Sequence, residues 1–211
     1  RVESPDPATI PAEKLAKTLP VEAYPHHDPE KNAPPHGLVS GPCGGWVVGK
    51  YLYVNGKDNS SLVQYDLDEI RRRPDAPPPP GRFVFRRSSP EDDPFIATRK
   101  HGNLYVEGPG AVVAHGGYLY VAFRTTSQVM RFPLTESGDV VRPIVADYLA
   151  QFDAYEKKGE GYTTTPDFFD LRADSTGRVF LSGNAKGSIW EIPTDGETFF
   201  DACTGTAAKP Y

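Results

Sequence analysis

The chain has 211 residues, of which 38% are hydrophobic and 24% charged, a composition typical of an ordinary folded domain. Its formal net charge of -5 argues against nucleic acid or an anionic membrane as the main partner. No apolar run approaches the ~18 residues that a membrane-spanning helix needs. The 22 prolines and 20 glycines predict many turns and few long helices.

Residues 1–37 are predicted to form a Pro-rich arm with one short helical segment, PAEKLAKTL, entered through Pro11. The chain begins at Arg1 and its single methionine is Met130, a start that either a removed export signal or a fragment would explain. We therefore expect a secreted or periplasmic protein. In such a compartment Cys43 and Cys203 are candidates for a disulfide, and the alternative is two unrelated thiols.

Three stretches of the chain repeat one strand pattern. Each has an apolar run, a turn, a second apolar run and then an alternating third run, as in GGWVVGKYLYVNGKDNSSLVQYDLDEI, GPGAVVAHGGYLYVAFRTTSQVMRFPL and PDFFDLRADSTGRVFLSGNAKGSIWEIPTDG. The step from the second run to the third is 9 residues in the first stretch and 8 in the others. Alternation of this kind predicts half-buried strands, and the glycine-containing turns predict antiparallel hairpins.

Repeated antiparallel meanders are typical of the blades of a β-propeller. The predicted fold is therefore all-β, with blades over residues 38–73, 81–142 and 160–200 in a domain that spans 38–211. The repeat distances, 67 and 60 residues, exceed the ~40–50 of an ordinary blade, so each interval must contain an insertion. We expect an additional hairpin in FIATRKHGNLYVEG and a helix near residues 145–158, where Val145, Tyr148, Leu149, Phe152 and Tyr155 share one helical face.

Three blades are fewer than the ~4–8 of a closed propeller, and an open wedge would leave sheet edges unprotected. Three explanations remain open. A degenerate blade lies within residues 81–106, the chain is part of a larger propeller, or a partner chain completes the ring.

Two family resemblances suggest what such a propeller would do. The segment EGPGAVVAHGGYLYVAFRTTSQVMRFPL resembles a blade of the SMP-30/gluconolactonase family that begins with Glu-Gly-Pro. The segment PDFFDLRADSTGRVFLSGNAKGSIWEI is similar to a blade shared by that family and strictosidine synthase-like proteins. This resemblance implies a divalent cation of the calcium class bound by Glu107 and Asp167, which would also be the catalytic residues. Phe168 departs from the family pattern, which has glycine there.

The second resemblance is to the propeller of nitrous oxide reductase. The segment GKYLYVNGKDNSSLVQYDLDEI is similar to one of its blades, and His26, His27 and His36 lie upstream as candidate copper ligands. The histidine that this family has just after Gly108-Pro109 is missing, and no Cys/Met/His cluster resembles its electron-entry copper site. His101 and His115 fall in predicted hairpin turns.

Other catalytic signatures are absent from the sequence, including a Gly-x-Ser-x-Gly elbow, a phosphate-binding Gly loop and a paired-cysteine zinc motif. Three classes of function therefore stay open. The first is a metal-dependent hydrolase or lactonase acting on a small molecule in the central funnel. The second is a copper oxidoreductase, and the third is a non-catalytic propeller that binds another protein.

Overall fold

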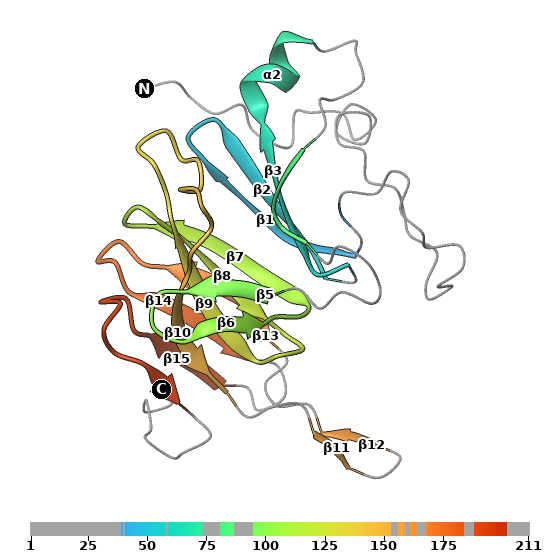
Figure 1. Ribbon diagram of the computed structural model, residues 1–211, viewed down its shortest axis with the longest axis vertical. Helices are drawn as coiled ribbons and strands as arrows, with labels where there is room; N and C mark the ends of the chain where they lie inside the picture. The colour runs from blue at the N-terminus through green and yellow to red at the C-terminus, as the bar shows by residue number, and fades with distance from the viewer. Residues whose placement is uncertain are drawn as a thin grey trace.

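The structure is a computed structural model that describes residues 39, 41–57, 59–73, 81–86, 95–152, 156–158, 161–163, 168–183 and 188–201. These residues are mostly β-strands, arranged in several sheets of which none is closed, and they include one short helix (Figure 1). The predicted all-β class is confirmed at this level. The predicted arm, residues 1–37, lies outside the described residues, and no helix within them is long and apolar enough to cross a membrane.

Three meandering sheets make up most of the fold. The first sheet has the order β1 (Pro42–Val48), β2 (Tyr51–Gly56), β3 (Ser61–Asp66) and β4 (Arg82–Phe85). The second has the order β7 (Pro109–His115), β8 (Tyr118–Phe123), β9 (Gln128–Pro133), β10 (Asp147–Gln151) and β16 (Phe200–Asp201). The third has the order β13 (Phe168–Ala173), β14 (Val179–Gly183) and β15 (Ser188–Ile192).

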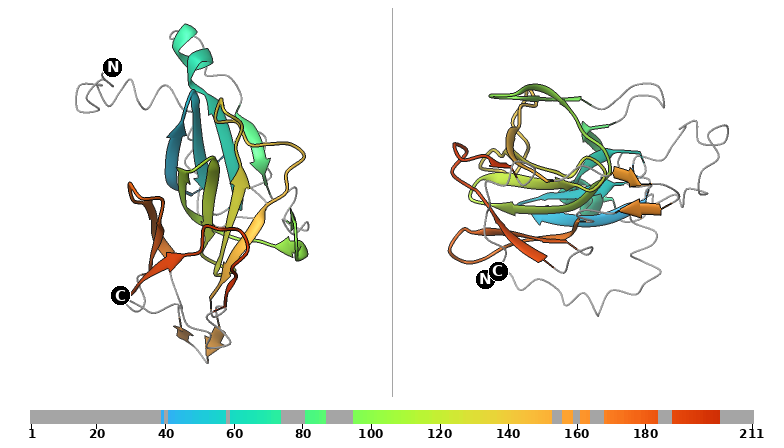
Figure 2. Two further views of the ribbon diagram at one scale, coloured as in Figure 1. Left: turned by 90° about the vertical axis from the view of Figure 1, so that its left-hand side faces the viewer. Right: turned by 90° about the horizontal axis from the view of Figure 1, so that it is seen from below.

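Within the three sheets all neighbouring strands are antiparallel except β16, which pairs in parallel with β10. Two separate hairpins and one helix complete the description: β5 (Phe95–Thr98) with β6 (Gly102–Tyr105), β11 (Glu156–Lys158) with β12 (Gly161–Thr163), and α2 (Leu67–Arg72). The helix and the β11–β12 hairpin lie at opposite ends of the molecule (Figure 2, left). The three repeated strand patterns and the additional hairpin are thus present as predicted.

The helix expected near residues 145–158 is a wrong prediction. Residues 147–151 form β10, which pairs with β9, and residues 156–158 form β11. Leu149 is buried in the core, and Asp147 is held by Arg131 with 2.8 Å between its Oδ2 and the arginine Nε. Pairing with β9 and this ion pair override the helical spacing of the apolar residues, because local propensity is weak beside tertiary contacts.

The second sheet lies between the other two (Figure 1). Its strands alternate with period two, so successive residues face opposite sheets. Val112, Val121 and Met130 pack toward the first sheet in one core cluster, while Ala111, Ala122 and Val129 pack toward the third sheet in another. Because both faces are covered, these strands are hydrophobic almost throughout, and the second sheet is the best buried of the three.

The three sheets share one register. We call the face of the first or second sheet that packs against the next sheet along the chain its front, and the opposite face its back. The back of the third sheet is the face that packs against the second sheet, and its front is the other face. Directly opposed front residues form the sets Gly44–Asn55–Leu62, Ala111–Ala122–Val129 and Asp170–Ser182–Ile189. The next residues on the same face, two positions along each strand, form the sets Trp46–Tyr53–Gln64, Val113–Tyr120–Arg131 and Arg172–Phe180–Glu191. The sequence repeat is therefore also a structural repeat.

Candidate functional site

A pocket lies where the first strands of the three sheets, β1, β7 and β13, come together. It has a volume of about 290 Å³ and is lined by Cys43, Gly44, Gly45, Gly110, Ala111, Val112, Asp170 and Arg172. Each strand contributes residues from the beginning of its run, so the three strands start at the same end of the stack. A site formed by equivalent positions of three repeats is a natural place for a small ligand.

The same irregularity occurs at the start of all three strands. The register with the second strand of each sheet shifts between Pro42 and Gly44, between Pro109 and Ala111, and between Phe168 and Asp170. One extra residue in each first strand forms a β-bulge: Cys43, Gly110 and Phe169. A bulge takes main-chain groups out of the ladder, and bulges are common beside active sites. Two of the three bulged residues, Cys43 and Gly110, line the pocket.

The charged groups of the pocket come from β13. Asp170 and Arg172 lie two residues apart on the front of the third sheet, and Arg172 Nη2 is 2.8 Å from Asp170 Oδ2. The guanidinium carbon of Arg172 also lies 5.9 Å from the centre of the Trp46 ring on β1. The pocket therefore combines one carboxylate, one guanidinium and main-chain groups of β1 and β7.

Asn55 lies directly behind the pocket wall. It is fully buried, and neither its Oδ1 nor its Nδ2 has a hydrogen-bond partner among the residues that the structure describes. A Cβ on Gly44 would lie 3.6 Å from Asn55 Oδ1 and 3.8 Å from the carbonyl oxygen of Gly110. The amide therefore lies at the interface between β1 and β7, close to the pocket but shielded from solvent.

Glu107 is positioned by a turn that leads into β7. Gly108 follows it with a φ of +65°, and a Cβ there would lie 2.4 Å from Thr125 Oγ1. The main-chain N–H of Glu107 donates to Thr126 Oγ1 at 3.3 Å, and that of Arg124 donates to the Gly108 carbonyl at 2.7 Å. The Glu-Gly-Pro segment is thus fixed against the loop after β8.

The Glu107 carboxylate is half-buried and accepts a hydrogen bond from the Tyr105 hydroxyl at 2.7 Å. No Lys or Arg side chain forms an ion pair with it in the part of the chain that the structure describes. A half-buried carboxylate without a cationic side chain fits the role of a cation ligand. Its predicted partner, Asp167, lies outside the described residues, and within those residues no three His, Cys, Asp or Glu side chains form a group that could hold a metal ion.

The other predicted ligands and the disulfide are not brought together by the described residues. His26, His27, His36 and Cys203 lie outside them. Cys43 is exposed, its thiol donates to the Gly41 carbonyl at 3.3 Å, and it forms no disulfide within the described chain. Copper binding and the Cys43–Cys203 disulfide remain predictions.

The remaining two histidines have ordinary positions. His101 lies in the turn between β5 and β6, where its ring packs edge-on against Tyr148 at 5.3 Å between centroids. His115 ends β7, and its Nε2 would lie 3.0 Å from a Cβ on Gly177 in the β13–β14 turn. The described residues show no metal-ligating partner for either of them.

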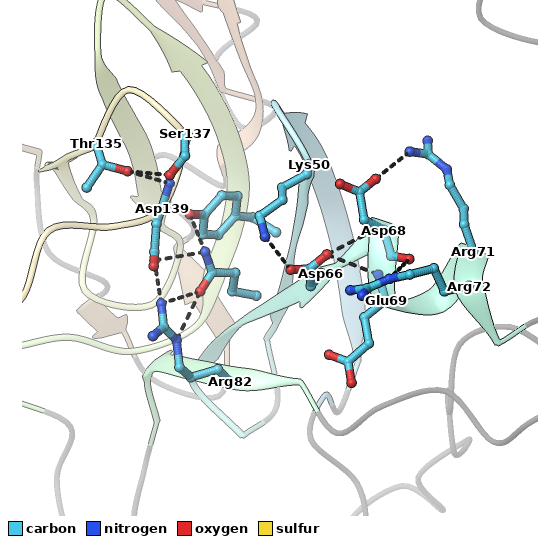
Figure 3. Close-up of polar contacts among 12 residues, drawn as sticks. Lys50, Asp66, Asp68, Glu69, Arg71, Arg72, Arg82, Thr135, Ser137 and Asp139 are labelled. Carbon is cyan, nitrogen blue, oxygen red and sulfur yellow. Dashed lines mark hydrogen bonds and ion pairs between the residues drawn. The ribbon is translucent and has the colours of Figure 1, made fainter.

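A second polar cluster, drawn in Figure 3, joins the first sheet to the loop after β9. Gln64 Nε2 donates to both the Tyr53 hydroxyl and Asp139 Oδ1 at 2.9 Å, and Arg82 donates to Gln64 Oε1 and to Asp139. Burial alone would raise the pKa of Asp139, but the hydrogen bonds from Arg82 and Gln64 more than offset it and lower that pKa. Burial also raises the pKa of Tyr53, whose hydroxyl donates to the Gly138 carbonyl. All these groups are mutually satisfied, which indicates a structural role.

Figure 3 also shows how α2 begins. The Asp66 side chain accepts hydrogen bonds from the main-chain N–H groups of Asp68 and Glu69, and it pairs with Lys50 at 2.7 Å. The hydrogen bond from Lys50 lowers the pKa of Asp66. This carboxylate is therefore a helix N-cap rather than part of a ligand site.

Sequence reasoning missed most of the pocket. Gly44, Gly110 and the Asp170–Arg172 pair were not identified, although the alternation of Asp170 and Arg172 on one strand places both side chains on the same face. Comparison with known proteins adds no assignment: no family model matches the chain, and a search of curated proteins finds no significant match.

Proposed function

We propose that this chain is part of a β-propeller that acts as a metal-dependent hydrolase on a small molecule bound in the pocket between β1, β7 and β13. The observation that carries this proposal is the pocket itself, which is lined by residues at or next to the equivalent bulges in the first strands of three sheets. The three sheets stack face to face with one register and with their first strands together, as the blades of a propeller do. The proposal makes these first strands the innermost ones of the ring.

Glu107 immediately precedes the turn into β7, and Asp167 immediately precedes β13. In the sequence, both residues therefore come just before neighbouring first strands, and β7 and β13 also supply residues to the pocket. No group of three possible metal ligands forms among the described residues, so the proposed metal site depends on Asp167. A calcium-class ion held by these two residues would polarise a substrate carbonyl.

The remaining groups of the pocket have simpler roles in this proposal. Arg172 has donors left beyond the one that faces Asp170, so it can hold a carbonyl or carboxylate oxygen of the bound molecule. Gly44 and Gly110 let the substrate approach the main chain of β1 and β7 closely. The Tyr105 hydroxyl orients the Glu107 carboxylate by donating to one of its oxygens.

Calcium binding to the full chain tests the proposal directly. We expect isothermal titration to show about one site, and Glu107→Gln and Asp167→Asn each to weaken binding at least tenfold. The matched control is Glu136→Gln, at an exposed position in the turn after β9, which we expect to leave binding unchanged. Equal calcium binding by native protein and Glu107→Gln would remove the metal site, and copper bound in its place would favour the oxidoreductase alternative.

A further inference from the structure

The front of the third sheet ends the stack on one side. On the first and second sheets, the equivalent faces pack against the back of the next sheet along the chain. In the described part of the chain no fourth sheet lies on the front of the third. Ile189 is 48% exposed there, whereas its equivalents Leu62 and Val129 are 0% exposed.

The front of the third sheet keeps part of the pattern of the two covered fronts but is more polar, since Asp170, Arg172 and Ser182 stand where the second sheet has Ala111, Val113 and Ala122. An aromatic side chain occupies the same place in each sheet, as Tyr53, Tyr120 and Phe180, and an aliphatic one occupies another, as Leu62, Val129 and Ile189. Above them lies a hollow of about 540 Å³, lined by Asp170, Arg172, Arg178, Phe180, Ser182 and Ile189. The aromatic and aliphatic side chains of the two existing interfaces thus recur on this more polar face, with room above them for a partner.

The back of the first sheet ends the stack on the other side. Its residues are equivalent to those that form the covered backs of the other two sheets: Gly45, Val47, Leu52, Val54, Val63 and Tyr65. Val39 covers Val63 and Tyr65, but Val47 is 55% exposed and Leu52 is only partly buried. This back is therefore apolar and incompletely covered by the described residues.

We propose that two copies of this chain associate head to tail, with the front of the third sheet of each copy on the back of the first sheet of the other. The occupant follows from the repeat, because every covered front in this chain lies against a back of the same kind. Among the described residues, one front and one back have no neighbouring sheet. A head-to-tail interface gives a closed ring when the rotation that relates one copy to the next leads back to the first copy. Three sheets from each copy make six, within the ~4–8 sheets that closed rings of this type contain.

The inference concerns assembly and does not depend on the metal chemistry proposed above. Its first test is the mass of the native protein in solution, measured by sedimentation equilibrium or light scattering. We expect twice the 23.1 kDa of one chain, falling to one chain on dilution. A mass of one chain at all concentrations, or any assembly other than two copies, would overturn the proposal.

Two charge variants test the orientation. In a head-to-tail pair, Ile189→Lys damages both interfaces of its homodimer, and so does Val47→Glu, so we expect each variant alone to be a monomer. Mixing them leaves one native interface and brings the new lysine opposite the new glutamate, so the mixture is expected to recover the dimer. Dimer loss in Ile189→Lys alone, with Val47→Glu still dimeric, would instead show a front-to-front pair and refute the head-to-tail arrangement.

The matched control is Val141→Glu, another exposed valine that becomes charged, but in the loop between β9 and β10 and not on a strand of either end face. We expect this variant to remain dimeric. Circular dichroism and thermal unfolding of each variant check that the chain is folded. A folded Val47→Glu or Ile189→Lys variant that keeps the native dimer would contradict the proposal.

Discussion

The turn that carries Glu107 depends on Gly108. Its φ of +65° is in the left-handed region, which is unfavourable for alanine, and a Cβ would also lie 2.4 Å from Thr125 Oγ1. We expect Gly108→Ala to lower the free energy of unfolding by about 2–3 kcal/mol, measured by urea denaturation. The control is Gly102→Ala, with a φ of +70° and no atom within 4 Å of the added Cβ, which we expect to cost only about 1 kcal/mol.

An equal loss of stability in the two glycine variants would mean that Thr125 moves aside at little cost. The position of Glu107 would then not depend on this contact. Calcium titration of Gly108→Ala provides a second measurement, because a displaced Glu107 is expected to bind the ion less tightly even when the variant is folded.

Asp139 should make stability depend on pH. Its pKa is lowered by hydrogen bonds from Arg82 and Gln64, so its contribution is fully present above the ordinary Asp pKa of about 4 and is lost as the pH falls through the lower folded value. We expect Asp139→Asn to lower the free energy of unfolding by about 1 kcal/mol at pH 7, a modest value because Asp139 and Arg82 are partly exposed.

At pH values below the folded pKa the native protein and Asp139→Asn should become equally stable. Urea denaturation at several pH values measures this convergence. Asp68→Asn, at an exposed position on α2, serves as the control and is expected to change stability little across the same range. A difference between native protein and Asp139→Asn that stays constant with pH would show that the carboxylate charge contributes nothing.

At the residue scale, the sequence identified side chains near the proposed site but not the contacts among them. Glu107 was selected from the short motif Glu-Gly-Pro, and its role as a metal ligand stays a prediction. The Arg82–Gln64–Asp139 cluster was not predicted, because Arg82 and Asp139 are 57 positions apart and meet only when the loop after β9 folds onto the first sheet. Such contacts depend on tertiary packing and leave no local pattern.

At the element scale, strands with strong alternation and glycine turns were predicted correctly, whereas β10 was not. Its residues place apolar side chains at both helical and strand spacings, so the local pattern was ambiguous. Pairing with β9 decided the outcome, and it joins residues that are 16 or more positions apart in the chain, such as Asp147 and Arg131. Hydrogen bonding to the edge strand β9 thus made the following segment, residues 147–151, a strand rather than a helix.

The ion pair between Arg131 on β9 and Asp147 on β10 should help to hold residues 147–151 as a strand. Asp147 and Arg131 side chains are only 8% and 6% exposed, and Asp147 also lies 3.2 Å from Arg99 Nε. We expect Asp147→Ala to lower the free energy of unfolding by about 3–5 kcal/mol in urea denaturation, because it leaves the buried charge of Arg131 uncompensated.

The exposed pair between Arg71 and Asp68 on α2 provides the comparison. Their side chains are 71% and 54% exposed, so Asp68→Ala is expected to change stability by less than about 1 kcal/mol. Asp147→Ala together with Arg131→Met should recover part of the lost stability, since it removes both charges. A loss below about 1 kcal/mol in Asp147→Ala would show that β10 is held by its backbone pairing alone.

At the scale of the whole molecule, the repeat in the sequence predicted three equivalent sheets, and their shared register and bulges agree with it. The number of sheets in a closed ring did not follow from the sequence, because it is set by the angle between neighbouring sheets and by what covers the two end faces. Single residues at those faces can look alike in sequence whether they are covered or not. Ile189 has the character of Leu62 and Val129, yet only Ile189 is largely exposed.

The difference in exposure among these three equivalent residues leads to a further prediction. Leu62→Ala and Val129→Ala remove fully buried side chains, so we expect each to lower the free energy of unfolding by about 2–4 kcal/mol. Ile189→Ala should cost less than about 1 kcal/mol at dilutions where the protein is a single chain, because half of the side chain is already in water. At concentrations where two copies associate, the same substitution should cost more, and its unfolding temperature should depend on concentration. Thermal unfolding of all three variants over a hundredfold range of concentration measures this; a cost for Ile189→Ala that is equally small throughout would mean that its face is never covered.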